Sequence, residues 1–217
     1  MAVVVFSDAS VPPSLCHSLI ERTFGLNMQL VLASGSPRRF ELLQLLDRPF
    51  TVVRPDVPEQ QALGETAQAY VERLARSKAA AGANLVQAPD AVVIGADTVV
   101  VCDQQVLEKP RDEADFQSMM QRLSGRTHQA MTAVAVHHQG VTQARVVVTQ
   151  VSFKVLSAKE IQAYWATGEP LDKAGGYGIQ GHAGKFVTHI EGSYLAVVGL
   201  PLYETEQLLL AVETNAE

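Results

Sequence analysis

Hydrophobic residues occur in short runs along the chain, and small polar turns separate these runs. The first clear run, from Gln29 to Ala33, is branched and apolar, which is typical of a strand buried on both faces. The turn 34–36 follows it. Ser36 can cap a helix through its hydroxyl, and Pro37 suits the first helical position, where a missing N–H costs nothing. The pattern predicts a strand, a turn and a helix that extends to Leu46.

The alternation of strand and helix continues to about residue 101. The predicted elements are a strand over 50–53, a loop over 54–64, a helix over 65–81 that stops at Gly82, and an apolar strand over 91–94 that is interrupted at 95–98 and resumes over 99–101. Strands joined in this way by helices are expected to be parallel, with right-handed crossovers.

The second half of the chain predicts antiparallel pairing, which makes the fold a mixed α/β one. A turn at 103–104 folds 106–109 back on the preceding strand, so that Lys109 is expected opposite Thr98 and close to Asp97. The other predicted elements are helices over 112–123 and 157–165, strands over 127–136 and 141–155, a glycine-rich stretch over 171–181, a regular segment over 185–190 and a helix from Pro201.

Composition narrows the class of protein. The 217 residues are 47% hydrophobic and 18% charged, which suits one globular domain with a sizeable core, and the net charge of −6 argues against a broad nucleic-acid-binding surface. Cys16 and Cys102 lie far apart without metal-ligand spacing, so neither disulfides nor a zinc site is predicted, and a cytoplasmic location is favoured.

The first 27 residues differ from the rest. They have an apolar start but no basic segment before it and no stretch long enough to cross a bilayer, so neither a signal peptide nor a membrane anchor is predicted. Strand patterning begins only after Met28. We therefore expect residues 1–27 to form an N-terminal extension, disordered in part, and residues 28–217 to form the folded domain.

Three stretches carry candidate chemistry, each with a plain structural alternative. The free N–H groups of the helix after Ser36, with Arg38 and Arg39, can bind a phosphate chain, although a capped helix with solvated arginines explains them equally well. Asp97 lies in an apolar run, where an unpaired carboxylate is costly, so we expect it to meet a cation, a metal or a ligand. Lys78, expected in the last turn of its helix, either complements the helix dipole or serves a site. The glycines of 171–181 either admit a ligand or simply connect two elements.

Six separated motifs add a resemblance to these residues. In chain order they are SGSPRR, GADTVV, EKPRD, LSGRTH, LDKAGGYGIQG and GSYLAVVGLP, and they resemble the Maf family of nucleoside triphosphate pyrophosphatases from Met28 to about Leu209. The resemblance implies an α/β fold with a two-lobed mixed sheet, flanking helices and a central cleft. It implies a hydrolase of acid anhydrides that converts a nucleotide to the monophosphate and pyrophosphate, a divalent cation (Mg²⁺ or Mn²⁺), and a homodimer.

The resemblance also implies roles for individual residues. Cleavage between the α and β phosphates needs an aimed water, a base, and cations that neutralise the leaving pyrophosphate. The implied catalytic residues are Asp97, as proton acceptor, with Lys78 and Lys109, and the implied substrate-binding residues are Ser34, Arg38, Arg39, Thr98 and Gln180. These residues favour catalysis over the alternative of a non-catalytic nucleotide-binding regulator of septum formation.

Three positions distinguish two subgroups of the family. One pairs S-P-R-R with A-D-T and I-Q-G and acts on dTTP and UTP, and another pairs S-P-W-R with S-D-Q and S-E-G and acts on 7-methyl-GTP. Arg38, Thr98 and Gln180 match the first subgroup. A glutamine amide can pair with the O4/N3–H edge of thymine or uracil, whereas Arg38 would repel a cationic methylated guanine.

The metal ligands are the part of the pattern that departs from the family. A carboxylate usually precedes the glutamate after the second strand, but this chain has Pro58, which cannot bind a metal. Either Glu59 or Asp56 then serves alone, or Asp97 and the triphosphate hold most of the cation. Our assignment is Asp97 with Glu59.

Overall fold

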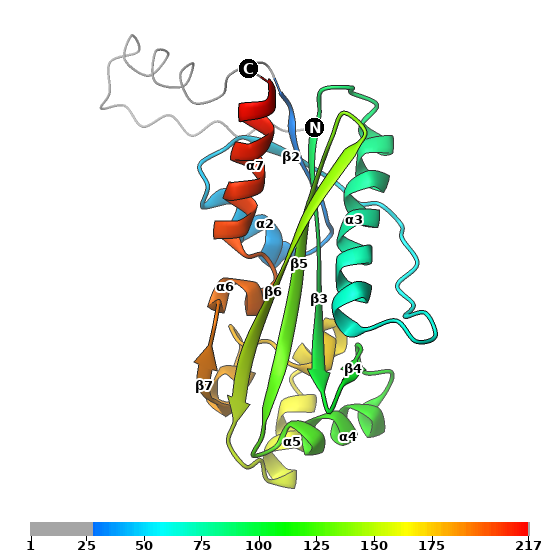
Figure 1. Cartoon of the computed structure of the whole chain (residues 1–217). Coiled ribbons are helices and arrows are strands. Elements are labelled where there is room, and N and C mark those ends of the chain that lie inside the picture. The colour runs from blue at the N-terminus through cyan, green and yellow to red at the C-terminus, as the bar shows by residue number, and fades with distance from the viewer. Residues whose placement is uncertain (1–27, 217) are drawn as a thin grey trace, which may run out of the picture.

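The computed structural model describes residues 28–216, and the predicted extension over residues 1–27 lies outside them. One seven-stranded mixed sheet forms its centre, in the order β2-β1-β3-β5-β6-β7, with β4 paired to β3 beside this path (Figure 1). The strands are β1 (Leu30–Ala33), β2 (Phe50–Val53), β3 (Val92–Cys102), β4 (Gln105–Leu107), β5 (Thr127–His138), β6 (Val141–Phe153) and β7 (Val187–Glu191).

Helices cover both faces and one end of this sheet. α3 runs along one face, α7 lies on the other, and α4 and α5 close the lower end of the long strands β3, β5 and β6 (Figure 1). The helices are α2 (Pro37–Gln44), α3 (Ala67–Val86), α4 (Glu113–Leu123), α5 (Ala158–Trp165), α6 (Tyr194–Val198) and α7 (Leu202–Ala216), with short 3₁₀ helices η1 (Glu169–Asp172), η2 (Ala174–Gly176) and η3 (His182–Phe186). None of these helices has the length and apolar character of a membrane span.

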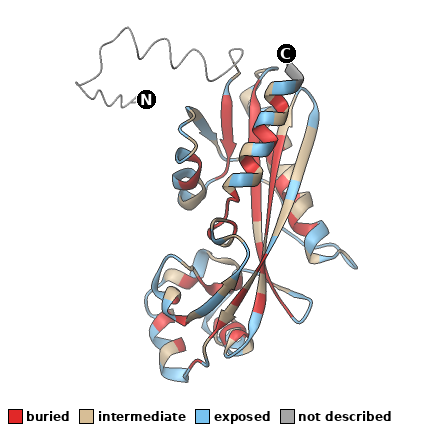
Figure 2. Cartoon of the chain, turned by 60° about the vertical axis from the view of Figure 1, so that its left-hand side comes forward, coloured by how far each residue is buried: buried red, intermediate tan, exposed pale blue. Residues whose placement is uncertain are grey.

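Successive side chains of a strand point to opposite faces of the sheet, so the core has one part on each face. Ala133 and Ala135 of β5 pack with α3, whereas Val134 and Val136 pack with α2 and α7 on the opposite face. A further cluster, around Phe116, lies between α4, α5 and the far ends of β3 and β5 and forms the core of a second lobe. Figure 2 shows the buried residues on the inner strands and on the helix faces turned toward them.

The predicted pairing is confirmed in both halves. β1 is parallel to β2 and to β3, and β3 pairs antiparallel with β4 in a register that places Val100 opposite Leu107. β5 and β6 form the expected long hairpin. The mixed α/β fold with flanking helices is therefore as predicted.

Several predicted boundaries are wrong, and close packing explains the largest error. α3 does not stop at Gly82 but continues to Val86, so Lys78 lies in the middle of the helix. A Cβ at Gly82 would lie 2.6 Å from the Cβ of Ala33, so this glycine lets α3 approach the sheet rather than ending the helix. β3 is continuous through Gly95 to Thr98, because the polar residues there remain in the ladder with β5.

The smaller corrections concern α2 and β6. α2 ends at Gln44, two residues earlier than predicted, and the Ser36 hydroxyl makes no capping hydrogen bond. The Oγ of Ser34 instead accepts a hydrogen bond from the backbone N–H of Ser36, at 3.1 Å. β6 ends at Phe153 rather than Val155.

A buried histidine in the second lobe makes stability sensitive to pH. The Nε2 of His128 is 2.8 Å from the Oη of Tyr177, and burial lowers the pKa of His128 to about 4. Because this pKa is below that of the unfolded chain, near 6.5, the unfolded state binds more protons in the window between the two values. The free energy of unfolding must therefore fall as the pH falls through this window.

We expect His128→Gln to remove this part of the pH dependence. When the pH is lowered from 7.5 to 5.0, the free energy of unfolding should fall by about 2 kcal/mol more in the wild type than in the variant. The size of this difference follows from the interval between pH 5.0 and the pKa of histidine in the unfolded chain, near 6.5. Urea unfolding at both pH values measures the difference. Equal losses in the two proteins would show that His128 is not held neutral.

Candidate active site

A gap in strand pairing at the centre of the sheet creates the site. β1 pairs with β3 only over 92–94, and β4 pairs with the same edge of β3 only over 100–102. In the described part of the chain, residues 95–99 of β3 thus have no strand neighbour on that edge. A cleft of about 610 Å³ opens here, at the carboxyl end of β1, where ligands commonly bind in α/β sheets.

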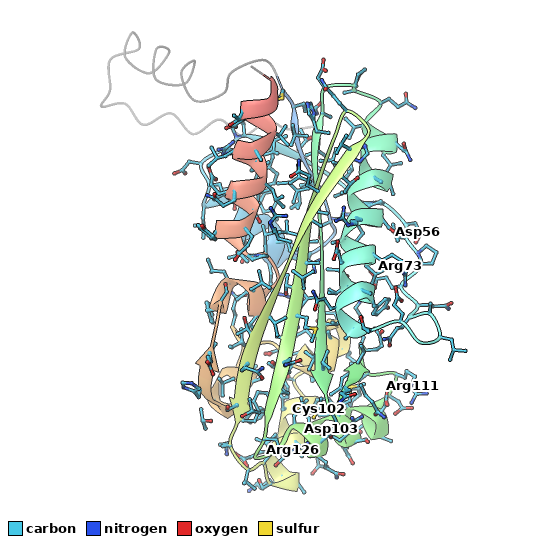
Figure 3. The ribbon with its side chains drawn as sticks, in the orientation of Figure 1. Asp56, Arg73, Cys102, Asp103, Arg111 and Arg126 are labelled. Atoms are coloured by element: carbon cyan, nitrogen blue, oxygen red, sulfur yellow. The ribbon has the colours of Figure 1, made fainter. Side chains whose placement is uncertain are left out.

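The cleft collects the residues that the sequence predicted for the site. Its walls come from the turn after β1, from α3, β3 and the β4–α4 connection, from the glycine-rich stretch and from the end of α6. They include Ser34, Arg38, Arg39, Glu59, Lys78, Asp97, Thr98, Lys109 and Gln180. Asp56 is not part of the lining, and Figure 3 shows it on the outer side of α3. Glu59 is therefore the carboxylate that the β2–α3 loop contributes.

Two adjacent residues of β3, Asp97 and Thr98, point to opposite faces of the sheet within the cleft. Asp97 is turned toward α3, where its Oδ1 accepts a hydrogen bond from Lys78 Nζ at 2.6 Å. Thr98 is turned to the opposite face, where its Oγ1 accepts from Arg39 Nη2 at 3.3 Å. The alternation of side chains along the strand thus places Asp97 and the partner of Arg39, Thr98, on opposite faces of the sheet.

Arg39 ties the turn after β1 to the rest of the cleft. Its Nε donates to the carbonyl of Gly199 at 2.9 Å, and its Nη1 lies 3.5 Å from the Oγ of Ser34. Burial lowers the pKa of Arg39 from its usual high value, but a guanidinium remains charged. Arg38 is held more loosely, with its Nη1 3.9 Å from a carboxylate oxygen of Asp172.

The Thr98 hydroxyl is engaged by the protein itself. It shares a 3.0 Å hydrogen bond with Thr132, whose own hydroxyl donates to the carbonyl of Ala196 at 2.6 Å. Thr98 must therefore donate to Thr132 while it accepts from Arg39. This arrangement fixes the orientation of Arg39 at the edge of the cleft.

Alternating charges run from the floor of the cleft to its rim. Lys78 Nζ lies between Asp97 Oδ1, at 2.6 Å, and Glu59 Oε1, at 2.5 Å, and Lys109 Nζ is 3.3 Å from the other oxygen of Glu59. The Lys78 side chain is only 12% exposed. The two carboxylate partners offset part of the hydration that a lysine buried to this degree loses.

The pKa of Glu59 reflects this arrangement. Partial burial would raise it, but the hydrogen bond from Lys78 and the charges of Lys78 and Lys109 outweigh burial and lower it. Lys109 is expected opposite Thr98 and close to Asp97, but the ladder of β3 and β4 ends at Leu107, before it reaches Lys109. Lys109 follows the end of β4 and contacts Glu59, and the lysine that contacts Asp97 is Lys78.

Tyr70 and Glu108 are among the cleft residues that were not predicted from the sequence. Tyr70 is fully buried on α3, and burial followed by the negative charge of Glu108 raises its pKa. Partial burial and the charges of Asp97 and Glu59 raise the pKa of Glu108, despite its interaction with Tyr70. Glu108 directly precedes Lys109 in a motif that the sequence showed, whereas nothing distinguished Tyr70 from other residues on the apolar face of a helix.

The glycine-rich stretch forms the wall opposite β3. A Cβ at Gly175 would lie 2.8 Å from the Cβ of Val100, and one at Gly176 would lie 2.9 Å from the Phe116 ring, so both must be glycine for this stretch to reach the sheet. Gln180 projects from it as an exposed side chain, and its amide has no hydrogen-bond partner among residues 28–216.

These features define a class of protein. Cations and a helix N-terminus at the carboxyl end of a parallel strand bind phosphate groups, and a buried aspartate paired with lysine beside them can accept a proton. The molecule is thus an α/β protein with a site for a phosphorylated ligand. Residues 29–212 match the family described as Maf-like protein, and the chain belongs to that family.

Its relatives agree with this assignment. The chain is 64% identical over 181 residues to the dTTP/UTP pyrophosphatase of Vibrio cholerae, a match that covers 83% of this chain and 96% of the relative. It is 60% identical to the protein of the same name from Vibrio vulnificus, over 83% and 97%, and 55% identical over 195 residues to that of Idiomarina loihiensis, over 88% and 98%. The resemblance expected from the six motifs is confirmed.

Proposed function

We propose that this chain hydrolyses dTTP and UTP to the monophosphate and pyrophosphate in the cytoplasm. The observation that carries the proposal is the gathering of Asp97, Lys78, Lys109 and the two arginines in one cleft, in a chain 64% identical to a protein named for this activity. Non-catalytic nucleotide binding would need the cations but would have no use for an aspartate that is held ready to accept a proton.

The phosphates are bound on the side of the cleft formed by the turn after β1. The first N–H groups of α2, Arg38 and Arg39 supply positive charge there, and Lys109 supplies it from the rim. Negative charge grows on the leaving pyrophosphate as the bond to the α phosphorus breaks. Fixed cations beside that charge stabilise the transition state more than the ground state.

Asp97 accepts the proton of the attacking water. Lys78 holds one carboxylate oxygen at 2.6 Å, and the other, Oδ2, accepts no hydrogen bond from residues 28–216. Asp97 and Ser34 line the same cleft, so a water on Oδ2 has an α phosphate within its reach when the triphosphate lies along the turn. The water oxygen bonds to the α phosphorus as the bond to the α–β bridging oxygen breaks, so the products are the monophosphate and pyrophosphate, and the proton passes from Asp97 to solvent.

The residues of the cleft fit a divalent cation. Mg²⁺ prefers oxygen ligands and is held in many phosphoryl-transfer sites by one or two carboxylates plus the substrate phosphates. An oxygen of Asp97 and an oxygen of Glu59 both contact the ammonium group of Lys78, so the two carboxylates are close enough to act on one cation, which supports this assignment. In the described chain, no group of three or more Asp, Glu, His or Cys side chains forms a metal site by itself. We therefore propose Asp97 and Glu59 as the protein ligands, and the cation would neutralise phosphate oxygens.

The proposed base specificity depends on Gln180 and Arg38. The unpartnered amide of Gln180 offers a donor and an acceptor to the O4/N3–H edge of uracil or thymine. A cationic 7-methylguanine would meet the Arg38 guanidinium, whose one ion pair among residues 28–216 is the long contact of 3.9 Å with Asp172. Arg38 therefore disfavours the 7-methyl-GTP activity of the other subgroup.

A panel of triphosphates tests the proposal. With Mg²⁺ or Mn²⁺ present, kcat/KM for dTTP and UTP should exceed that for ATP, GTP and 7-methyl-GTP by at least about tenfold, because a site built for one hydrogen-bonding edge rejects others strongly. Gln180→Glu should reduce this preference. Pyrophosphate release at equal substrate concentrations measures it. A purine triphosphate as the best substrate would overturn the specificity, and binding without pyrophosphate release would favour the regulator.

A further inference from the structure

Gln180 lies in a segment that has little regular structure to hold it. Residues 177–181 connect η2 to η3 without a helix or strand of their own, and the Gln180 side chain has no hydrogen-bond partner among the described residues. A side chain that must select one base edge from another has to be held in place before the ligand arrives. The position of Gln180 must therefore come from contacts made by its neighbours.

Ile179 packs against the core, and two hydrogen bonds to the backbone of this segment come from one pair of side chains, Tyr164 and Glu169. The backbone N–H of Gly178 donates to Tyr164 Oη at 3.1 Å, and the backbone N–H of His182 donates to Glu169 Oε2 at 2.9 Å. Tyr164 Oη in turn donates to Glu169 Oε1 at 2.8 Å. The backbone is thus fixed two residues before and two residues after Gln180 by the same hydrogen-bonded pair.

The pair also lies directly against the backbone of this segment. A Cβ at Gly181 would lie 2.3 Å from Oε2 of Glu169, and one at Gly178 would lie 3.3 Å from Oε1. Tyr164, on α5, is only 2% exposed. Partial burial raises the pKa of Glu169, but the hydrogen bonds from His182 and Tyr164 outweigh it and lower that pKa, so the carboxylate stays ionised as an acceptor.

We propose that Tyr164 and Glu169 are positioning residues for Gln180 and determine how strongly the enzyme prefers pyrimidine over purine triphosphates. The proposal rests on the function proposed above, in which Gln180 contacts the base. Neither side chain belongs to the group that handles the phosphates or the attacking water. Their loss should therefore change base selection and leave the chemical step largely intact.

Tyr164→Phe and Glu169→Gln test the proposal. Each removes part of the hydrogen-bonded pair with little change in volume, and Glu169→Gln leaves one acceptor oxygen for two donors. The ratio of kcat/KM for UTP to that for GTP should fall about tenfold in each variant, on the scale of one lost hydrogen bond. KM for UTP should rise by a similar factor, while kcat at saturating UTP should stay within about threefold of wild type.

A double-mutant cycle distinguishes positioning from general damage to the fold. In a Gln180→Ala background, Tyr164→Phe and Glu169→Gln should change the UTP/GTP ratio no further, because the side chain that they position is gone. The matched control is Glu160→Gln, in the capping box of α5, where Glu160 accepts from the backbone of Ser157 at 3.0 Å. This control should lower Tm and leave the ratio unchanged.

The outcomes separate this inference from the proposed function. If the wild type prefers UTP and both variants keep its UTP/GTP ratio, the positioning role is wrong. If the wild type prefers GTP, the proposed function is wrong instead. Should Tyr164→Phe fail to fold, Glu169→Gln with its Gln180→Ala partner decides the question.

Discussion

Asp97→Asn is expected to abolish pyrophosphate release while the protein stays folded. Asparagine keeps the size of aspartate and an oxygen that can accept the hydrogen bond from Lys78 Nζ, now 2.6 Å from Oδ1. It cannot accept a proton from water. Loss of general-base catalysis costs about 10²- to 10⁴-fold, so kcat with UTP should fall by about 10³-fold, with KM changed much less.

The matched control for this prediction lies on the same hairpin. Asp103, in the turn between β3 and β4, is paired with Arg126 at the lower end of the sheet, away from the cleft (Figure 3). Asp103→Asn removes one charge from an exposed pair, whose contribution to stability is small, and should leave kcat unchanged. A kcat for Asp97→Asn within threefold of wild type would exclude Asp97 as the base.

Helices, strands and turns could be predicted from the sequence where the residues that determine them, such as caps and turn residues, are close in sequence. The register of the β3–β4 hairpin followed from its turn alone, and the helix predicted over 157–165 begins at a capping box formed by Ser157 and Glu160. The errors occur where distant residues decide. Gly82 was read as a helix stop, but its role is set by Ala33 and Val93 on the sheet, which the sequence does not place beside it.

In the site, too, features set by residues close in sequence were predicted better than features set by distant residues. All nine residues assigned to the site from the sequence line one cleft, and seven of them lie in the six family motifs, whereas Glu59 and Lys78 lie outside these motifs. The partners of those residues were less predictable. Lys109 contacts Glu59 rather than Asp97, because β4 ends at Leu107 and the chain then turns toward the β2–α3 loop. Such pairings depend on how two loops 50 residues apart approach each other.

The distance between α3 and β3 is what allows Lys78 to reach Asp97, and Gly95 sets that distance. A Cβ at Gly95 would lie 2.4 Å from both the carbonyl oxygen of Ala75 and the backbone nitrogen of Ala79. These are backbone atoms of α3, which cannot rotate away as a side chain could. Lys78 is adjacent to Ala79 in the helix, and Asp97 is two residues from Gly95 on the strand. The helix backbone and the strand backbone are therefore in direct contact beside the Lys78–Asp97 pair.

Gly95→Ala should consequently impair both stability and activity. Overpacking costs about 1–3 kcal/mol, and contact with a rigid backbone places this variant near 3 kcal/mol, a fall in Tm of about 6–12 °C for a chain of this size. Because α3 must move outward, the 2.6 Å bond between Lys78 and Asp97 should lengthen, and kcat/KM for UTP should fall at least about tenfold. Gly140→Ala is the control: its φ of +79° makes alanine strained by about 1 kcal/mol, but nothing lies within 4 Å, so Tm should fall slightly with kcat/KM unchanged. If Gly95→Ala lowered Tm as expected but kept full kcat/KM, the separation of α3 from β3 would not govern the position of Lys78.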